Sequence, residues 1–200
     1  SCDIRDYDLV YNALKGCDSV FHLAALIGIP YSYISPLAYI RTNIEGTYNI
    51  LQSAKMLGTE NILITSTSET YGTAQYVPID EKHPMVGQSP YSASKIGADQ
   101  LSLSYYRSFD LPVKIVRPFN TYGPRLDLGA RYARVISRFI TQALRSEPIT
   151  VHGDGKQTRS FCYITDTATC LIKMLAKENI PGAVVNVGNP QEVTILELAE

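Results

Sequence analysis

Several absences in this sequence narrow the class of protein before any motif is considered. The 18 basic and 19 acidic residues nearly cancel, giving a net charge of −1, so electrostatics gives no reason to expect a nucleic acid or an anionic membrane as a partner. No apolar run approaches the roughly 20 residues of a membrane-spanning helix. The first residues include the charged Asp3, Arg5 and Asp6 and therefore do not resemble a secretory signal peptide.

Cysteine is scarce and poorly placed for disulfides or metal binding. The four cysteines form no CxxC pair and do not cluster with the three histidines, which themselves lack the spacing of metal ligands. We therefore expect reduced thiols in a cytoplasmic protein without a metal site. Tryptophan is absent, whereas tyrosine occurs 14 times. Because 45% of the residues are hydrophobic and 18% charged, the chain can bury a core.

The glycine-rich turn that binds the diphosphate of dinucleotides is also missing. No segment matches GxGxxG or GxxGxxG, and the nearest segment, HGDGKQ at residues 152–157, leads into a predicted strand rather than a helix. It lacks the helix N-terminus that would bind a phosphate, so we expect an ordinary turn there.

Helix and strand patterns alternate over the first 117 residues. Buried strands are predicted at 19–24, 61–66 and 113–117, and helices at 6–15, from Pro36 to Gly58, and from Pro90 to about Arg107. Ser35 and Ser89 stand as N-caps before the two prolines. Such alternation with apolar strands predicts a parallel sheet with helices on both faces, an α/β fold.

The pattern loosens after residue 122. The later predicted elements are a helix at 134–145, short strands at 149–152 and 160–164, a helix at 165–176, a strand at 183–187 and a helix whose capping box begins at Thr194. We therefore expect a first domain at 1–122 and part of a smaller lobe at 123–200, with 165–188 returning to the first domain.

Two Tyr-x-x-x-Lys pairs occur, and their contexts differ. A spacing of four places both side chains on one helix face, where Lys⁺ favours the phenolate and makes Tyr a usable general base. With 14 tyrosines, chance matches are common. Tyr11 and Lys15 lie on a capped helix without polar neighbours and are expected to form a surface pair. Tyr91 and Lys95 instead follow a strand that ends in hydroxyl and carboxylate side chains, at the sheet edge where ligands bind.

Together with further motifs, this pair resembles the extended short-chain dehydrogenase/reductase superfamily, the NAD-dependent epimerases and dehydratases of nucleotide sugars. The resemblance covers essentially the whole chain. It rests on DIRD (3–6), FHLAA (21–25), TNIEGT (42–47), STSETYG (66–72), YSASK (91–95), RPFNTYGPR (117–125), GDGKQTRSF (153–161) and VNVGN (185–189). Several of these motifs in order are far more specific than any one alone.

Different parts of the chain resemble different branches of the superfamily. STSE and YSASK, with residues 24–39 and 88–100, are similar to bacterial UDP-N-acetylglucosamine 4,6-dehydratases of the legionaminic acid type, whereas residues 134–161 and 186–200 resemble UDP-glucuronate decarboxylases. Because the chemistry depends on the site, we predict a 4,6-dehydratase acting on a UDP-sugar such as UDP-N-acetylglucosamine. The alternatives are a UDP-glucuronate decarboxylase, a nucleotide-sugar 4-epimerase and, outside enzymes, an inactive nucleotide-binding fragment.

The resemblance also implies the architecture and the cofactor. It implies NAD bound to a Rossmann-like, doubly wound parallel sheet that lacks its first strands and glycine-rich loop, followed by part of a substrate-binding lobe. The chain then corresponds to the interior of a longer enzyme, so we expect these 200 residues alone to bind NAD poorly and to have little activity. Helices 36–56 and 90–107 pair between subunits in related proteins, which implies a homodimer.

Catalytic roles follow from the same resemblance. Tyr91 would remove the proton of the sugar 4-hydroxyl, Lys95 would lower the pKa of Tyr91 and hold the nicotinamide ribose, and Thr67 would hydrogen bond to the same hydroxyl. After oxidation at C4, Glu69 would remove the acidified C5 proton, water would leave from C6, and the hydride would return to C6. Ser68 stands where some members carry an acid, so it would relay a proton or position a water.

Binding residues are implied in the same way. The implied cofactor contacts, besides Tyr91 and Lys95, are Asp3, Ile4, Leu23, Ala24, Ala25 and Thr42. The implied substrate contacts, besides Thr67, are Asn120, Arg125, Arg159 and Asn186. The two arginines suit the substrate diphosphate because a planar guanidinium matches its geometry.

Overall fold

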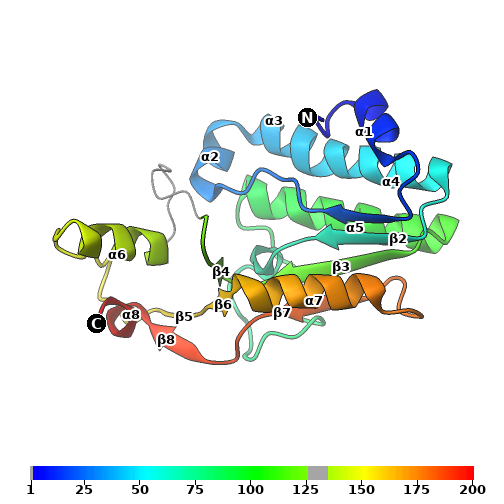
Figure 1. The fold of residues 1–200 in the computed structure, drawn as a ribbon. Coiled ribbons are helices and arrows are strands. Elements are labelled where there is room, and N and C mark those ends of the chain that lie inside the picture. The colour runs from blue at the N-terminus through cyan, green and yellow to red at the C-terminus, as the bar shows by residue number, and fades with distance from the viewer. Residues whose placement is uncertain (1, 126–134) are drawn as a thin grey trace. The chain divides into compact units, whose positions relative to one another are not determined.

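The computed structural model describes residues 2–125 and 135–200, which form two compact units (Figure 1). The first unit contains residues 1–118 and 170–186, and the second contains residues 119–169 and 187–200. The sequence-based division at residue 122, with a return at 165–188, stays a prediction about the domains of the protein.

A four-stranded parallel sheet organises the first unit. The strands lie in the order β1-β2-β3-β7, and their bounds are β1 (Ser19–His22), β2 (Asn61–Thr65), β3 (Val113–Pro118) and β7 (Val184–Val187). Phe21 pairs with Leu63 across β1 and β2, and Ile64 pairs with Ile115 across β2 and β3. This sheet confirms the predicted α/β fold.

Helices connect the strands in the predicted alternation. The helices of this part of the chain are α1 (Tyr7–Leu14), α2 (Ile29–Ile34), α3 (Pro36–Tyr39), the π-helix η1 (Ile40–Glu45), α4 (Gly46–Leu57), the short 3₁₀ helix η2 (Ser68–Tyr71) and α5 (Pro90–Phe109). Buried apolar residues of α1, α4, α5, β2 and β3 form one core cluster. Ile62 and Ile64 of β2 and Leu51 of α4 are fully or almost fully buried within it.

Two side chains of β3 contact helices on opposite faces of the sheet. Arg117 contacts Asp99 of α5, whereas Lys114 donates hydrogen bonds to the carbonyl oxygens of Leu175 and Lys177 at the end of α7 (Ile164–Ala176). Side chains three apart in a strand point to opposite faces. The strand is therefore covered on both sides, which is the doubly wound arrangement.

The predicted single helix from Pro36 to Gly58 is wrong in its interior. Helix α3 passes into the π-helix η1, which is wider by one residue per turn, before α4 continues to the left-handed Gly58. The extra residue shifts the phase of the helix. Leu37, Ile40 and Tyr48, which share a helical spacing in the sequence, are exposed, whereas Leu51 is buried.

The second unit consists of short elements. Strands β4 (Thr121–Tyr122) and β6 (Cys162–Tyr163) form one pair, and β5 (Thr158–Ser160) and β8 (Glu192–Thr194) form another, with α6 (Val135–Leu144) and α8 (Ile195–Ala199) beside them in the chain. The capping box that starts α8 is present, because Thr194 and Glu197 bond reciprocally. Residue 134, the predicted start of α6, lies outside the described residues.

The strand predicted at 149–152 is absent from the described structure. Instead, the Gln142 side chain donates hydrogen bonds to Pro148 O and Thr150 Oγ1 and accepts one from Thr150 N. These bonds satisfy backbone polar groups of the segment, which therefore needs no neighbouring strand. HGDGKQ forms the predicted turn, with Gly153 and Gly155 in left-handed conformations.

Within the described residues, no helix is both long enough and apolar enough to cross a membrane.

Candidate functional site

The carboxyl end of β2 presents the first part of the site. Beyond Thr65 the chain turns into η2, and Thr67 is its N-cap, with Thr67 Oγ1 accepting a hydrogen bond from Glu69 N at 3.2 Å. Thr70 Oγ1 donates to Thr67 O at 2.9 Å. The Thr67 side chain is nearly buried and fixed by its capping role.

Tyr91 and Lys95 come from the first turns of α5. Ser89 caps this helix through a reciprocal pair of bonds with Ser92, and Pro90 occupies its first turn, as predicted. Tyr91 is 5% exposed and Lys95 is 3% exposed. Lys95 Nζ donates to Thr65 O at 2.7 Å. The ammonium therefore lies at the carboxyl end of β2, the edge where the sequence places the site.

The other Tyr-x-x-x-Lys pair differs in its burial and in its partners. Lys15 is exposed, donates to Asn12 Oδ1, and lies over the Tyr11 ring at 5.2 Å from its centroid. This is the expected surface pair.

Burial sets the electrostatics of Lys95. Removal from water lowers the pKa of Lys95, and the negative charge of Asp99 opposes that fall. The same ammonium acts on His22 at the end of β1. Burial, with a smaller effect of Lys95, lowers the pKa of His22 from 6.5 to about 3. His22 is therefore neutral at ordinary pH.

The neutral His22 is held by hydrogen bonds that fix its tautomer. Thr47 Oγ1 donates to Asn43 O at 2.7 Å, so its hydrogen is used, and His22 Nε2 lies 3.0 Å from the same Oγ1. His22 Nε2 must therefore donate to Thr47.

Asn43 and Tyr39 support Tyr91 from the π-helical region. The Asn43 amide binds both the N–H and the carbonyl of Leu26, and it donates to Ser94 Oγ at 2.9 Å. The Tyr39 ring packs edge-on against the Tyr91 ring, with centroids 6.2 Å apart. Sequence reasoning missed both residues. The signal available for Asn43 is a polar residue three positions after Ile40, within the predicted apolar face of the helix.

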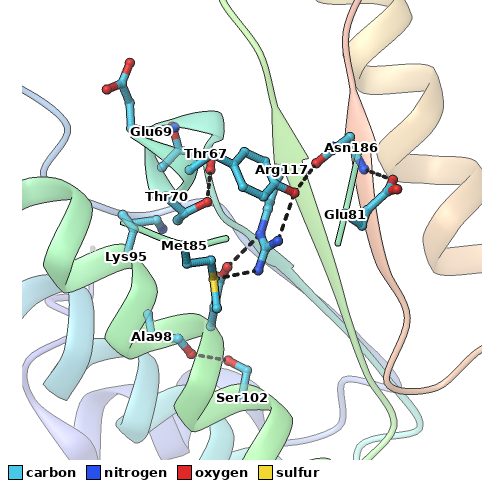
Figure 2. Close-up of polar contacts among 12 residues, drawn as sticks. Thr67, Glu69, Thr70, Glu81, Met85, Lys95, Ala98, Ser102, Arg117 and Asn186 are labelled. Carbon is cyan, nitrogen blue, oxygen red and sulfur yellow. Dashed lines mark hydrogen bonds and ion pairs between the residues drawn. The ribbon is translucent and has the colours of Figure 1, made fainter. Parts of the chain in front are cut away.

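A buried cluster around Arg117 was also missed. Arg117 Nε donates to Asp99 Oδ2 at 3.0 Å, its Nη1 donates to Tyr71 Oη at 2.9 Å, and its Nη2 lies 3.2 Å from Met85 Sδ. Tyr71 Oη donates in turn to Asn186 Oδ1 at 2.7 Å. Figure 2 shows Arg117 at the centre of these contacts, which join α5, β3, η2 and β7.

The loop at 72–88 is fastened to this cluster. Val86 N donates to Thr70 O at 2.9 Å, and Asn186 N donates to Glu81 Oε1 at 2.7 Å. Gly72 has φ +65°, and a Cβ there would lie 2.7 Å from Val86 O. Glycine is required at this position because the two backbone segments approach too closely for a side chain.

Glu69 and Ser68 differ from the buried residues. The Glu69 side chain is exposed, Ser68 is half-buried, and in Figure 2 the Glu69 carboxylate extends away from the other labelled residues. Within residues 2–125 and 135–200, the Glu69 carboxylate forms no hydrogen bond or ion pair. It is therefore free to act on a bound molecule, and its assignment as a base stays a prediction.

Most of the predicted cofactor contacts lie near the ends of strands or helices. Leu23 and Ala24 follow β1 and are exposed, Ala25 and Thr42 are half-buried, and Asp3 is exposed. The Arg5 side chain, 2.6 Å away, lowers the pKa of Asp3 to about 2. Ile4 packs against Gly46, and its carbonyl accepts from Asn49. Ile4 thus has a packing role beside its predicted one.

Three predicted substrate contacts belong to the second unit. Asn120 Nδ2 donates to Ser160 O at 3.0 Å, Arg159 is exposed with Nη1 on Thr158 O, and Arg125 is exposed with φ +66°. Asn186 belongs to the first unit, where its amide binds Tyr71 and Ile79 O. Its polar atoms are used to join the Arg117 cluster to the loop, so it has a structural role, and its contact with substrate stays a prediction.

In the described part of the chain, no group of three or more His, Cys, Asp and Glu side chains is arranged to hold a metal ion.

Comparison with known proteins identifies a matching family and similar relatives. The model of the NAD dependent epimerase/dehydratase family matches residues 1–188. UDP-glucuronic acid decarboxylase 4 of Arabidopsis thaliana is 40% identical over 199 residues, which cover 97% of this chain and 44% of that relative. The chain thus spans less than half of the length of this relative.

Solved structures of similar proteins have the same fold. The UDP-N-acetylglucosamine 4-epimerase from Methanobrevibacter ruminantium M1, in complex with UDP-N-acetylmuramic acid, has a TM-score of 0.94 at 33% identity, with 98% of this chain and 63% of that chain covered. A double mutant of the dTDP-glucose 4,6-dehydratase from Streptomyces venezuelae, with NAD bound, has a TM-score of 0.90 at 31% identity, with 98% and 60% covered.

The burial of neutral His22 predicts a pH-dependent stability. Because the pKa falls from 6.5 in the unfolded chain to about 3 in the folded one, the unfolded chain binds the extra proton, and stability is lost as pH falls through this window. The slope contributed is up to about 1.4 kcal/mol per pH unit. Urea unfolding at a series of pH values measures it.

His22→Gln should flatten this dependence between pH 6.5 and 4, whereas the matched change of the exposed His152, His152→Gln, should leave it unchanged. Parallel curves for wild type and His22→Gln would show that His22 is not buried in the neutral form.

Proposed function

The chain belongs to the NAD dependent epimerase/dehydratase family, and from this premise we propose that the protein oxidises C4 of a UDP-sugar and removes carbon dioxide from a uronic acid. The observation that carries the choice of reaction is the 40% identity to a UDP-glucuronic acid decarboxylase over 97% of the chain. The dehydratase reaction predicted from the STSE and YSASK segments becomes the second candidate.

The residues of the first unit fit the NAD cofactor of the family. Lys95 is fixed at the carboxyl end of β2 beside Tyr91, where parallel sheets bind ligands, and the exposed Ala24 leaves the backbone after β1 open to a diphosphate. Asp3 is an ionised carboxylate that can accept a hydrogen bond from the adenine amino group. We propose Tyr91 and Lys95 as the residues that hold the nicotinamide ribose. Bound NAD supplies a reversible hydride acceptor for the sugar C4.

The first chemical step uses residues common to all three candidate reactions. Tyr91 removes the proton of the 4-hydroxyl as the C4–H bond breaks, and Thr67 hydrogen bonds to the same oxygen. The Lys95 charge favours the Tyr91 phenolate, which makes the phenol an effective base. Because this step is shared, its residues do not discriminate between decarboxylation, dehydration and epimerisation.

The second step differs between substrates. In a uronic acid, the C4 ketone is β to the C6 carboxylate, so the C5–C6 bond breaks, carbon dioxide leaves, and the electron pair passes into the C4 carbonyl. C5 then gains a proton and C4 regains the hydride, which yields a UDP-pentose. In a dehydration, a base must instead remove the C5 proton before water leaves from C6. Glu69, exposed two residues beyond Thr67, supports that second candidate.

We expect the intact protein, supplied with NAD, to release carbon dioxide from UDP-glucuronate and to form a UDP-pentose. The matched substrates are UDP-N-acetylglucosamine, GDP-mannose and dTDP-glucose, and the products are identified by mass spectrometry. A 4-keto-6-deoxy sugar from any of these three, without carbon dioxide from UDP-glucuronate, would replace the decarboxylase by the dehydratase.

The same assay with Glu69→Gln separates the two reactions further. Loss of a general base costs about 10²- to 10⁴-fold, so dehydration should fall at least a hundredfold. Carbon dioxide release should fall less than about tenfold, because no proton is removed from C5. Glu60→Gln, at the opposite end of β2, is the matched control and should change neither rate. A hundredfold loss of carbon dioxide release would mean that Glu69 acts in the decarboxylation itself.

We also propose that the protein forms a homodimer through α3, η1 and α4, with α5 beside them. The support is a set of exposed apolar side chains on these elements, namely Leu37, Ile40, Tyr48 and Met56. Large apolar side chains that remain exposed on neighbouring elements favour an interface. Sedimentation velocity should give a dimer that Ile40→Glu converts to a monomer, whereas Ile172→Glu, an exposed apolar site on α7, should not. A wild-type monomer at all concentrations would contradict the proposal.

A further inference from the structure

A row of three side chains runs along α5 behind the site. Tyr91, Lys95 and Asp99 are spaced by four residues, so they share one helix face, and all three are buried. Asp99 is fully buried. Within the described part of the chain it is the one carboxylate among the buried charged residues, whereas the buried cations are Lys95, Lys114 and Arg117.

The two oxygens of Asp99 have different surroundings. Oδ2 accepts from Arg117 Nε at 3.0 Å. Oδ1 is buried and has no hydrogen-bond partner among the described residues. The Ser66 hydroxyl lies near enough to lower the pKa of Asp99, although it too makes no well-formed hydrogen bond. Among the described residues, Asp99 Oδ1 is thus left without a hydrogen-bond donor.

Arg117 holds this carboxylate in place. Its remaining nitrogens bind Tyr71 Oη and Met85 Sδ, and its guanidinium carbon lies 5.0 Å from the centre of the Tyr71 ring. Burial raises the pKa of Asp99, and the Arg117 charge opposes that rise. Arg117 therefore both orients the carboxylate and favours its ionised form.

The charged groups facing Lys95 come from each element packed against it. Tyr91 and Asp99 share its own helix, His22 faces it from β1, and β2 contributes the neutral Thr65 carbonyl. Arg117 of β3 meets Lys95 only through Asp99. Because burial keeps His22 neutral, Asp99 is the group that supplies a negative charge to this ammonium.

We propose that Asp99 is a positioning residue that keeps the buried Lys95 charged and thereby sets the ionisation of Tyr91. This rests on the proposed function, in which Tyr91 is the base. An ammonium buried without a carboxylate tends to lose its proton, and a neutral Lys95 cannot stabilise a phenolate.

The spacing along the helix decides the direction of the effect. Along the helix axis, Lys95 lies about 6 Å from Tyr91 and Asp99 about 12 Å, at 1.5 Å per residue. The direct effect of the Asp99 charge would raise the pKa of Tyr91, but Asp99 is twice as far along the helix from Tyr91 as Lys95 is. Removing Asp99 therefore acts mainly through Lys95. Loss of the Lys95 charge raises the pKa of the phenol toward its ordinary value of about 10.

Asp99→Asn in the intact protein tests this inference without turnover. The phenolate absorbance of Tyr91, obtained as the difference between each protein and the same protein carrying Tyr91→Phe, is followed against pH. The pH at which Tyr91 loses its proton, called the Tyr91 step below, should rise by about one unit or more. The acid limb of kcat/KM should move with it. An unchanged Tyr91 step would overturn the proposal.

Two further variants separate positioning from folding. Tyr71→Phe loses the hydrogen bonds to Arg117 and Asn186 but leaves the Arg117–Asp99 pair in place, so it should lower the Tm without moving the Tyr91 step. Asp99→Glu keeps the negative charge and should restore the step toward its wild-type position. If Tyr71→Phe moved the step as far as Asp99→Asn, the effect would be one of packing, and the proposal would fail.

The phenol titration also distinguishes this inference from the proposed function. A shifted Tyr91 step in a protein that acts on none of the four nucleotide sugars would reject the function and keep the Asp99 role. A protein that decarboxylates UDP-glucuronate with the same acid limb in wild type and Asp99→Asn would keep the function and reject the Asp99 role.

Discussion

The site depends on one interaction, the hydrogen bond from the buried Lys95 ammonium to the Thr65 carbonyl at 2.7 Å. Burying an ion costs several kcal/mol unless other groups compensate it. Here the compensation comes from a strand carbonyl and from the Asp99 carboxylate on the same helix. Both groups are placed by the sheet. Thr65 ends β2, and the Asp99 carboxylate is held by Arg117 of β3.

The fold supplies this arrangement through local features of the chain. Parallel pairing of β1, β2 and β3 aligns the carboxyl ends of the strands, and the Ser89 cap fixes where α5 begins. Asn43 is buried in η1, and its amide joins the segment after β1 to α5.

Much of this could be predicted from the sequence, because it depends on periodicity and capping. Alternating apolar strands predicted the sheet, and the Ser89-Pro90 start placed Tyr91 and Lys95 on one face at the end of a strand. The phase shift at η1 could not be predicted, because one extra residue in a turn leaves the composition of a helix unchanged. Contacts between residues far apart in the sequence could not be predicted either. Arg117 contacts Asp99 across 18 residues of sequence, and Tyr71 contacts Asn186 across 115. The sequence therefore indicates for Asn186 only a substrate contact and not its bond to Tyr71.

The proposed chemistry of Tyr91 depends on the charge of Lys95, and NMR of the protein with ¹³C- and ¹⁵N-labelled lysine measures that charge directly. The Lys95 signals are assigned by their loss in Lys95→Arg, and their shifts are followed against pH. We predict an ammonium at pH 7 despite a pKa lowered by burial. A Lys95 side chain that is already a neutral amine at pH 7 would contradict it, because Tyr91 would then have no buried charge beside it.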